Sequence, residues 1–556
     1  MNKKLAILLS AVLMLVSLFP MGIAETAYQG TGPGYGGELK VEVVMEGETI
    51  KDILLLENRE SSPVVKRAFP AIRDRILEAQ TPVVDSVSAA TFTSYGVKSA
   101  VANALREAGK EVEKITFDTK GPEKEPVTLE PVKTDIVIIG GGPAGLTAAI
   151  AAKEAGVENV IVIEKLGIIS GNGKFDMNCF DVINSKAQKD AGMDYTKEMF
   201  IESKQNAGET PERLQAWAEG ANEQDAWLRS FGVELNHCMG GTVHMAEVDA
   251  YAGEEIQDGM EARVRELNVD IRTDTKGYDF VFDGDKVVGV KVQHLNESYD
   301  ILADAVILAT GGFSANKELL AKYAPGAEIV ATSNQMGATG DFVPLFEKYD
   351  YQIKNMDVLI VFKQIIKHRR DLTGAGDGFI FVNENGERFA DESSSGLGLA
   401  HKILEQKKVF YIYDQALYDS SYRLVKHNKL GYHTKADTLE ELAAALKIDA
   451  ENLKASVDGY NKGVAGEAPD PFREKSFTRP FAAEGPYYGV QIESAIHMTK
   501  GGVVTDAKAR VLNKDNQVVE GLYAAGEVTW ISGAYSAAMV FGRIAGQEAA
   551  AVVLQK

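Results

Sequence analysis

The first residues suited to chemistry are the glycines of Gly140-Gly141-Gly142-Pro143-Ala144-Gly145. They follow Asp135–Ile139, an apolar run typical of a buried strand, and they open the predicted helix Gly145–Ala155. Glycines here allow a tight turn and close approach of the backbone to a pyrophosphate, while the helix N-terminus supplies partial positive charge. The second predicted strand, Val160–Ile163, ends at Glu164, whose carboxylate can accept hydrogen bonds from ribose hydroxyls. This βαβ pattern predicts a dinucleotide site at Gly140, Gly142, Ala144, Gly145 and Glu164.

Two later turns bear on whether the dinucleotide is NAD or FAD. Ala305–Thr310 with Gly311-Gly312 resembles the Ala-Thr-Gly-Gly turn of flavoproteins that have two dinucleotide-binding folds. Gly521–Glu527 resembles their C-terminal flavin motif, and the predicted helix Phe541–Leu554 follows it. The resemblance implies FAD rather than NAD. Thr310 and Gly311 would then contact the cofactor, Glu527 would approach its ribityl chain, and the last helix would point its N-terminus at the isoalloxazine.

A stretch rich in serine, threonine and alanine, Asp85–Ser94, precedes the predicted helix Gly96–Ala108. It resembles the Asp-x-x-Ser/Thr-Gly-Ala-Thr signature of FMN-binding domains, in which a flavin transferase attaches FMN to the last threonine through a phosphoester. The resemblance implies covalent FMN on Thr91, with Ala89 at a position where that family has glycine. The alternative is an ordinary loop that enters a helix.

From about residue 35 to its C-terminus, the chain resembles the fumarate reductase/urocanate reductase group of flavoproteins. The resemblance implies an FAD-dependent oxidoreductase acting on C=C bonds, with Asn172 and Asp341 among the FAD-binding residues. The markers occur in family order and are the Thr91 signature, Gly140–Gly145, Glu164-Lys165, Gly171-Asn172, Gly337–Asp341, Gly386–Phe389, His497–Gly502, Ala525–Glu527 and Phe541–Gly546.

The fold class implied is α/β. A Rossmann-like, two-dinucleotide-fold FAD domain would carry an inserted capping domain, and a small α+β FMN-binding domain would precede it. The expected boundaries are a signal peptide at 1–24, the FMN-binding domain at 36–118, a linker at 119–133, the FAD domain at 134–362 and 493–556, and a mobile capping domain at 363–492. Substrate would bind at the junction of the FAD and capping domains, where closure excludes water.

Within the small domain, period-two alternation predicts strands at Leu39–Met45 and Ile50–Leu56. Amphipathic spacing predicts a helix at Ser62–Ala79 in addition to Gly96–Ala108. The segment Thr26–Gly37 is rich in glycine and tyrosine and is interpreted as a linker.

The substrate region departs from the family pattern. Gly396 stands where the family has a proton-donating arginine, and Leu372 and Ala375 stand where a Glu/Arg pair feeds protons to it. Gly533-Ala534-Tyr535-Ser536 replaces the segment with the carboxylate-clamping arginine, and Phe362-Lys363 replaces a substrate histidine. Two bidentate anchors for carboxylates are thereby lost, so we do not expect fumarate as the substrate.

Other residues could take over these roles. Lys363, Arg369 and Arg370 are cations that could substitute for the missing arginines. Tyr535 could protonate carbon or hydrogen-bond an enone oxygen. His497 could bind a polarising carbonyl or relay protons, and Lys500 could add a cation near the substrate. Packing or solvation alone also explains each of these side chains.

Composition sets the compartment and the partners that we expect. Lys3 and Lys4 precede the apolar run Leu5–Phe19, and small residues follow, so the start predicts a signal peptide and an extracytoplasmic or secreted protein, with an uncleaved anchor as the alternative. The net charge of −21 disfavours nucleic acid and anionic membrane surfaces as partners. The two cysteines, Cys179 and Cys238, could pair or remain thiols, and no cysteine pattern suits a haem, an iron–sulfur cluster or another metal.

These observations predict an exported two-flavin reductase that passes electrons from FMN to FAD and then to a C=C bond. The expected acceptor is an aryl enoate, another monocarboxylate or an enone rather than fumarate. Its expected partners are a flavin transferase and a membrane or extracytoplasmic electron donor. The alternatives are a fumarate- or urocanate-type reductase with a rearranged site, an electron-transfer shuttle, and an oxidase or dehydrogenase running in reverse.

Overall fold

The computed structural model describes residues 25–175, 180–206, 208–239, 243–245, 252–374, 376–473, 479–530 and 533–555. The predicted signal peptide, Cys179 and Ala375 lie outside these residues. The chain divides into two compact units, Met1–Lys124 and Glu125–Lys556, here called unit 1 and unit 2. Across the described residues, no helix combines the length and the apolar character that crossing a membrane requires.

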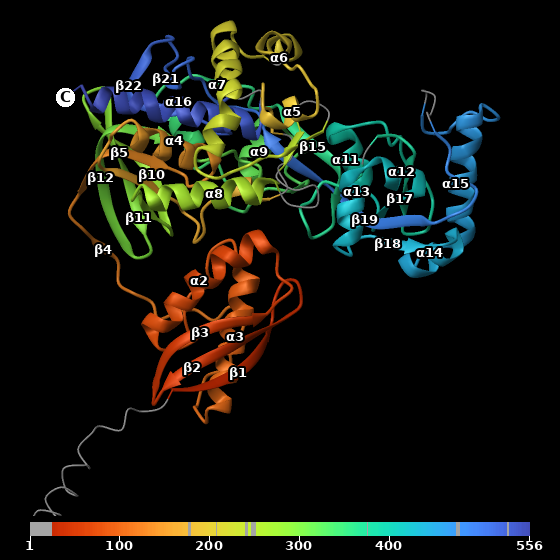
Figure 1. Ribbon diagram of the computed structural model, residues 1–556, viewed down its shortest axis with the longest axis horizontal. Helices are drawn as coiled ribbons and strands as arrows, with labels where there is room; N and C mark the ends of the chain where they lie inside the picture. Colours follow the sequence, from red (N-terminus) through yellow and green to blue (C-terminus); the bar gives the residue numbers. More distant parts are fainter. Residues whose placement is uncertain are drawn as a thin grey trace, which may run out of the picture. The chain divides into compact units, whose positions relative to one another are not determined.

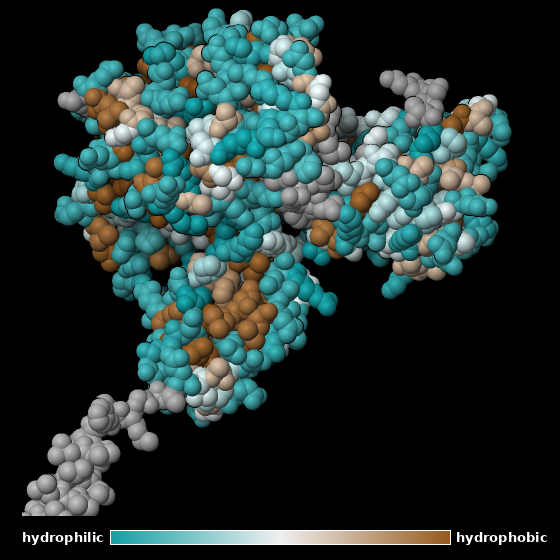
Figure 2. All heavy atoms as spheres, in the orientation of Figure 1, coloured by the Kyte–Doolittle hydropathy of each residue, from teal (hydrophilic) through white to brown (hydrophobic). Residues whose placement is uncertain are grey.

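Unit 1 is a three-stranded antiparallel sheet with helices packed against it (Figure 1). Inward-facing residues of the central strand are buried, whereas Leu54 and Leu56 on the next strand are exposed. Figure 2 shows a patch of hydrophobic residues on the visible face of unit 1. The elements are β1 (Glu25–Pro33), β2 (Glu38–Glu46), β3 (Thr49–Glu57), α2 (Ser62–Ala79) and α3 (Thr91–Glu107).

Strand β1 corrects the prediction of a linker at Thr26–Gly37, and it extends the small domain upstream of residue 36. Gly30 and Gly32 weaken the sequence signal for a strand. They are needed because α3 crosses β1 at close range: a Cβ on Gly30 would lie 2.1 Å from the carbonyl oxygen of Ala100, and one on Gly32 would lie 2.1 Å from that of Gly96. Close packing of backbones, rather than strand propensity, therefore selects these residues.

Helix α3 begins at Thr91, five residues before the predicted start at Gly96. Thr91 is thus the first residue of the helix, where backbone N–H groups and the helix dipole favour a phosphate. The preceding turn requires a left-handed residue, and Ala89 has φ of +70°. This conformation explains the glycine of the FMN signature, since a Cβ in this region costs about 1 kcal/mol or more.

We expect Ala89→Gly to stabilise unit 1 by about 1 kcal/mol, because it removes this conformational cost. All three tryptophans, Trp217, Trp227 and Trp530, belong to unit 2, so their fluorescence follows unit 2 alone. Urea unfolding followed by circular dichroism should show a higher midpoint for unit 1, with an unchanged tryptophan transition. An unchanged or lower midpoint for unit 1 would show that the turn is not strained.

Unit 2 is built on a nine-stranded mixed sheet whose central strands are parallel. In β5, Ile136 and Ile138 face the cluster that contains α4 and α16, while Val137 and Ile139 face the opposite cluster. The elements before the cap are β4 (Val127–Thr128), β5 (Val132–Ile139), α4 (Pro143–Glu154), β6 (Val160–Ile163), η1 (Gly171–Lys174), α5 (Lys186–Asp190), α6 (Lys197–Lys204), α7 (Pro211–Arg229), β7 (His237–Met239), β8 (Val243–Met245), α8 (Ala252–Glu266), β9 (Asp270–Arg272), β10 (Thr275–Asp283), β11 (Lys286–His294), β12 (Glu297–Leu308), α9 (Lys317–Tyr323), β13 (Ala331–Thr332), α10 (Val343–Lys348) and β14 (Ile353–Lys354).

A second, six-stranded sheet carries the capping region, with α11 to α15 around it (Figure 1). Its elements are β15 (Leu359–Ile366), β16 (Phe379–Asn383), α11 (Gly396–Leu404), β17 (Val409–Asp414), α12 (Gln415–Ser420), α13 (Tyr422–Lys429), β18 (Thr434–Ala436), α14 (Leu439–Leu446), α15 (Ala450–Ala465) and β19 (Tyr487–Thr499). The chain returns to the first sheet through β20 (Gly502–Val503), β21 (Arg510–Leu512), β22 (Val518–Ala524) and α16 (Tyr535–Val553).

Three predicted boundaries differ from the observed elements. The division between the units falls inside the segment 119–133, but residues 127–128 of β4 and 132–133 of β5 pair with β12, so the C-terminal part of that segment belongs to the sheet of unit 2. Strands β15 and β19 pair with each other across the predicted cap boundaries at 362/363 and 492/493. The two domains of unit 2 are therefore joined by hydrogen-bonded strands instead of single connecting segments.

Candidate active site

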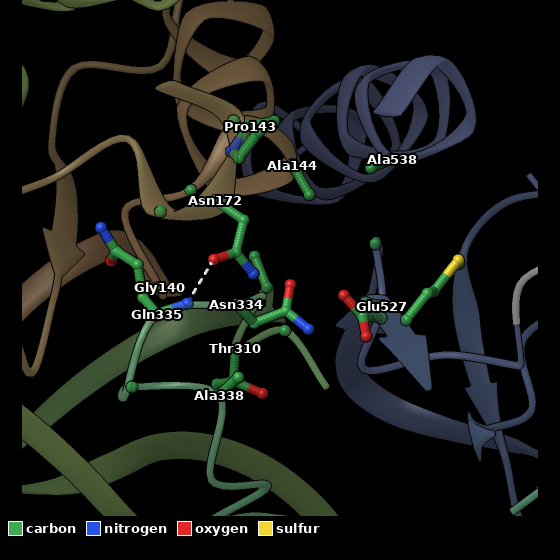
Figure 3. Close-up of a pocket in the computed structure, with 18 of the residues that line it drawn as sticks. Gly140, Pro143, Ala144, Asn172, Thr310, Asn334, Gln335, Ala338, Glu527 and Ala538 are labelled. Atoms are coloured by element: carbon green, nitrogen blue, oxygen red, sulfur yellow. Dashed lines mark hydrogen bonds between the residues drawn. The ribbon is translucent and has the colours of Figure 1, made fainter. Parts of the chain in front are cut away.

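A cavity of about 410 Å³ lies in unit 2, a size typical of ligand pockets. It extends from the glycine turn before α4 to residues of the capping region. Figure 3 shows the dinucleotide end, where the glycine turn, Asn172, Thr310 and Glu527 face a common space. The predicted residues that line the cavity are Gly140, Gly142, Ala144, Glu164, Asn172, Thr310, Gly311, Asp341, His497, Lys500, Glu527 and Tyr535.

The glycine turn has the geometry that a pyrophosphate needs. Gly140 has φ of +112°, and a Cβ there would lie 2.2 Å from the carbonyl oxygen of Ala309. Gly145 does not line the cavity but supports the turn from behind, since a Cβ on it would lie 1.9 Å from the carbonyl oxygen of Gly140. A Cβ on Gly142 would have the Cα of Gly171 as its nearest neighbour, at 3.9 Å, so the space beside Gly142 is open. The turn therefore presents open backbone at the start of α4.

The last helix also reaches the cavity because it lies close to α4. A Cβ on Gly542 would lie 2.4 Å from the carbonyl oxygen of Ala144, and one on Gly546 would lie 2.3 Å from that of Ala148. These two glycines let the helix backbones approach, which brings the first residue of α16, Tyr535, to the cavity wall.

Several polar groups at the dinucleotide end are buried, and two of them could form hydrogen bonds with a ligand. Glu164 accepts hydrogen bonds from the backbone N–H groups of Gly141 and Leu166, at 3.0 and 2.9 Å, and burial raises the pKa of its carboxyl. Thr310 Oγ1 and Gln335 Oε1 are buried and have no hydrogen-bond partner among the described residues. With the open glycine turn, these atoms fit a dinucleotide that supplies hydroxyl, ring and phosphate partners.

Asn172 and Asp341 organise the neighbouring wall. The side-chain oxygen of Asn172 accepts a 2.7 Å hydrogen bond from the backbone N–H of Gln335 (Figure 3). Burial would raise the pKa of Asp341, but Lys165 and Lys276 outweigh it and hold that pKa below its usual range. Asp341 is therefore a paired carboxylate, and the two lysines are held beside the dinucleotide end.

Glu527 lies at the end of the C-terminal flavin motif, where it contacts Thr499. Its Oε1 accepts hydrogen bonds from the backbone N–H and the hydroxyl of Thr499, at 2.8 and 3.0 Å. Burial raises the pKa of Glu527 to about 7. The carboxyl therefore changes its protonation state near neutral pH instead of remaining an anion.

We expect the Glu527→Gln variant to gain stability over the unmodified chain as pH rises. The folded pKa of about 7 lies above the ordinary value of 4.5, so the native state binds more protons between these values and loses stability as pH rises through them. Glutamine does not titrate. In the apoprotein, the difference in melting temperature between E527Q and the unmodified chain should grow from about pH 4.5 to about pH 7 and then level off. A difference that is constant across this range would contradict the raised pKa.

His497 lies near the end of β19 and is neutral at pH 7. Burial lowers its pKa to about 4. Its Nδ1 lies 3.0 Å from Ser333 Oγ, and its ring stacks on Phe362 with centroids 4.3 Å apart. A neutral, oriented imidazole can donate or accept one hydrogen bond toward a ligand.

Tyr535 and Lys500 both line the cavity but differ in burial. Tyr535 is 4% exposed, its ring packs against Phe180, and its hydroxyl accepts a 2.6 Å hydrogen bond from the amide of Gln257 on α8. The backbone N–H of Lys500 donates to the carbonyl oxygen of Val358, at 2.9 Å, and its side chain is half-buried at the cavity wall. The catalytic roles of both residues stay predictions.

In unit 1, an aromatic cluster includes Phe92, the residue that follows Thr91. Phe92 is 52% exposed and lies with ring centroids 5.9 Å from Tyr35 and 4.8 Å from Phe117. Tyr95 packs on the same Phe117 ring. Exposed aromatic rings beside a hydroxyl at a helix N-terminus suit a flavin that is anchored by its phosphate.

The turn that carries Thr91 is held from beneath by buried polar groups. Ser94 Oγ accepts from the backbone N–H of Val87 and donates to the carbonyl oxygen of Ala90, at 3.0 and 2.9 Å. The ammonium of Lys98 donates to three oxygens around the same turn, and burial lowers its pKa. The turn is therefore held by side-chain hydrogen bonds from within unit 1.

Comparison with known proteins assigns the two units. Residues 135–538 match the FAD binding domain family and residues 34–106 match the FMN-binding domain family. The chain is 30% identical over 568 residues to urocanate reductase of Eggerthella lenta, covering 96% of this chain and 93% of that protein. This chain belongs to the FAD-binding fumarate reductase/urocanate reductase family and has an N-terminal FMN-binding domain.

Other members of this flavoprotein family share the same region. NADH:fumarate oxidoreductase of Klebsiella pneumoniae is 29% identical over 536 residues, which is 92% of this chain but only 57% of that protein's length. Vinyl phenol reductase of Lactiplantibacillus plantarum is 26% identical over 446 residues, or 70% of this chain and 89% of that protein. The open conformation of a flavocytochrome c3 fumarate reductase superposes with a TM-score of 0.68 at 30% identity, covering 76% of this chain and 79% of that one.

Within this flavoprotein, the three cations considered as replacements for the missing arginines separate into two groups. Arg370 lines the cavity. Arg369 stacks over the Tyr432 ring at 4.7 Å, and Lys363 donates to the backbone carbonyl oxygens of Glu392 and Ser394; neither residue lines the cavity. Arg370 is thus the one of the three that can reach a ligand in the cavity.

The substrate end also contains residues that the sequence did not reveal. Arg423, in the first turn of α13, lines the cavity together with Asp371 and Phe175. Leu372, at the position of the family's relay glutamate, lines it as well, whereas Gly396 at the start of α11 does not. Arg423 carries no recognisable motif, because its place at the cavity depends on how the cap folds back.

Proposed function

We propose that this flavoprotein reduces the activated C=C bond of a small organic acceptor, an aryl enoate, another monocarboxylate or an enone rather than fumarate. The observation that carries the proposal is the single cavity that joins the dinucleotide cradle to the cap residues Phe362, Arg370 and Arg423. An electron-transfer shuttle needs no such space above its flavin. A reductase requires it, because the acceptor must lie against the isoalloxazine and away from water.

Bound FAD, once reduced by two electrons, would supply a hydride to one carbon of the acceptor, and a proton added to the neighbouring carbon would complete the reduction. His497 is neutral and oriented by Ser333, so it suits a hydrogen bond to the acceptor's carbonyl. The Tyr535 hydroxyl accepts a hydrogen bond from the Gln257 amide, which helps to fix its position at the cavity wall. Tyr535 is our candidate for the proton donor, with Lys500 as an additional cation beside the acceptor.

The lining of the cavity supports an acceptor with a flat apolar part. Phe362 and His497 are stacked, and Ile360, Met498 and Phe175 are further apolar lining residues. Gly396 stands where the family has its proton-donating arginine, and Gly533–Ser536 replaces the segment with the carboxylate-clamping arginine, so a C4 dicarboxylate would lack its usual partners. Relatives named for fumarate, urocanate and vinyl phenol reduction indicate that the acceptor varies among similar proteins.

Electrons would enter through FMN that a flavin transferase attaches to Thr91, and would then pass to FAD. The aromatic cluster beside Thr91 and the helix N-terminus at that residue support this assignment. The basic and apolar N-terminal segment supports export, so that a membrane or extracytoplasmic protein would be the electron donor.

The test is oxidation of reduced methyl viologen by the purified protein, produced together with a flavin transferase. Cinnamate, urocanate, an aryl enone and fumarate are supplied in parallel. We expect turnover with aryl enoates or enones that exceeds turnover with fumarate. Turnover of fumarate alone would refute the proposed acceptor class, and oxidation of the dye by none of these acceptors would favour a shuttle.

A further inference from the structure

We infer that Arg370 and Arg423 of the capping region together bind the carboxylate of the acceptor, so that the substrate is an enoic acid rather than a neutral enone. This inference rests on the proposed function and narrows it. The family's usual arginines are missing at Gly396 and Gly533–Ser536. The inference assigns the anion site to two residues at other positions.

Both arginines reach the same cavity from separate cap elements. Arg370 lies in the turn that follows β15, and Arg423 lies in the first turn of α13. Their elements are tied together: Arg423 Nη1 is 3.5 Å from the carbonyl oxygen of Gly374, and His427 Nδ1 is 3.1 Å from Thr373 Oγ1. The turn and the helix therefore form one connected wall that presents two guanidinium groups to the cavity.

The backbone at Arg370 is held in an unfavourable conformation. Its φ is +66°, in the left-handed region that non-glycine residues rarely adopt. Its guanidinium lies 5.6 Å from the centre of the Phe175 ring, which lines the same cavity. Strained backbone that aims a charged side chain into a cavity is a recurrent property of binding sites.

The cap contributes more cations than acids to the lining of the cavity. Its charged lining residues are the two arginines, Arg370 and Arg423, and one acid, Asp371. Guanidinium groups bind carboxylates through parallel charge-assisted hydrogen bonds, so two of them suit one carboxylate well.

The apolar surroundings determine what the rest of the acceptor must be. Phe175, Phe362, Ile360 and Met498 offer flat, uncharged surface beside these cations. A second carboxylate placed against this apolar surface would be desolvated at a considerable cost. The geometry therefore favours one carboxylate conjugated to a planar apolar group, as in an aryl enoate.

The experiment uses the full-length, flavinylated protein and the variants Arg370→Gln, Arg423→Gln and Arg369→Gln. The Arg369 variant is the matched control, because this neighbouring arginine stacks on Tyr432 and does not line the cavity. Cinnamate and its neutral ketone analogue, 4-phenylbut-3-en-2-one, are compared with reduced viologen as donor. FAD content is measured in each variant from its absorbance.

We expect R370Q and R423Q each to lower kcat/KM for cinnamate by about 30-fold or more, with the ketone changed by less than about three-fold and FAD content unchanged. R369Q should resemble the unmodified protein with both compounds. Equal losses for the acid and the ketone, or an equal loss in R369Q, would overturn the inference. Loss of FAD from either cavity variant would instead assign that arginine to the cofactor and would also overturn it.

A second readout separates this inference from the proposed function. Binding of 3-phenylpropanoate and of 4-phenylbutan-2-one is followed through the visible spectrum of bound FAD, which requires no turnover. If no acceptor is reduced but the acid binds to the unmodified protein and not to R370Q or R423Q, the anion site stands and the reductase proposal fails. If the acid binds equally to all variants, the anion site fails whatever the turnover.

Discussion

Replacing Thr91 with alanine is expected to abolish covalent FMN while FAD binding is retained. The phosphoester requires a hydroxyl, and Thr91 supplies one at the N-terminus of α3, where a phosphate is favoured. The residues that would hold FAD line a cavity in unit 2, and Thr91 belongs to unit 1, so the substitution should not disturb the FAD site. Intact mass spectrometry should show the loss of one attached FMN, and absorbance should fall to the level of FAD alone.

Thr91→Ser is the matched control, since it keeps the hydroxyl and removes only a methyl group. The serine variant should carry covalent FMN when it is produced with the same flavin transferase. FMN that remains attached to the alanine variant would show that another residue is the acceptor. Thr93 is a poor alternative site because it is 3% exposed and its hydroxyl donates to Glu60.

Gly145→Ala should give a chain that purifies without FAD. A Cβ at this position would lie 1.9 Å from the carbonyl oxygen of Gly140, and that oxygen belongs to the turn that faces the pyrophosphate. The neighbour is backbone rather than a flexible side chain, so the turn itself must move. Because the helix N-terminus and the turn bind the phosphates together, we expect FAD affinity to fall by at least two orders of magnitude, or about 3 kcal/mol.

Gly459→Ala is the control for this substitution. Gly459 lies inside helix α15 of the cap, and no atom is within 4 Å of a Cβ built there. Alanine should therefore raise stability by about 0.5–1 kcal/mol and leave FAD bound. FAD retained at the full level in the Gly145 variant, measured by absorbance after desalting, would contradict the assigned role of the turn.

The bounds of helices and strands could be predicted from the sequence where the local pattern of apolar residues is regular. The strand Val160–Ile163 and the helix Ser62–Ala79 have the predicted bounds, because an unbroken apolar run and a regular amphipathic pattern determine them. Strand β1 was missed because its glycines serve the packing of a helix that lies about 70 residues further on, which no local pattern contains.

The candidate site divides in the same way. The glycine turn and Glu164 were predicted because cofactor chemistry imposes their spacing within one βαβ unit. Arg423 was not, since a lone arginine on a short helix has no signature until the cap brings it to the cavity. The hydrogen bond between Gln257 and Tyr535 joins residues 278 positions apart and was likewise beyond any spacing rule.

Strand β19 has a mechanical consequence. Its first half pairs with β17 of the cap, and its second half, which contains His497 and ends at Thr499, pairs with β13 and β15. Because β19 is hydrogen-bonded to its neighbours along its length, a rotation of the cap would change the position of the His497 imidazole as well. Thr499, two residues on, is bonded to Glu527. The cap, the His497 imidazole and the Glu527 carboxyl would then move together, so that the position of the cap would determine the geometry of the site.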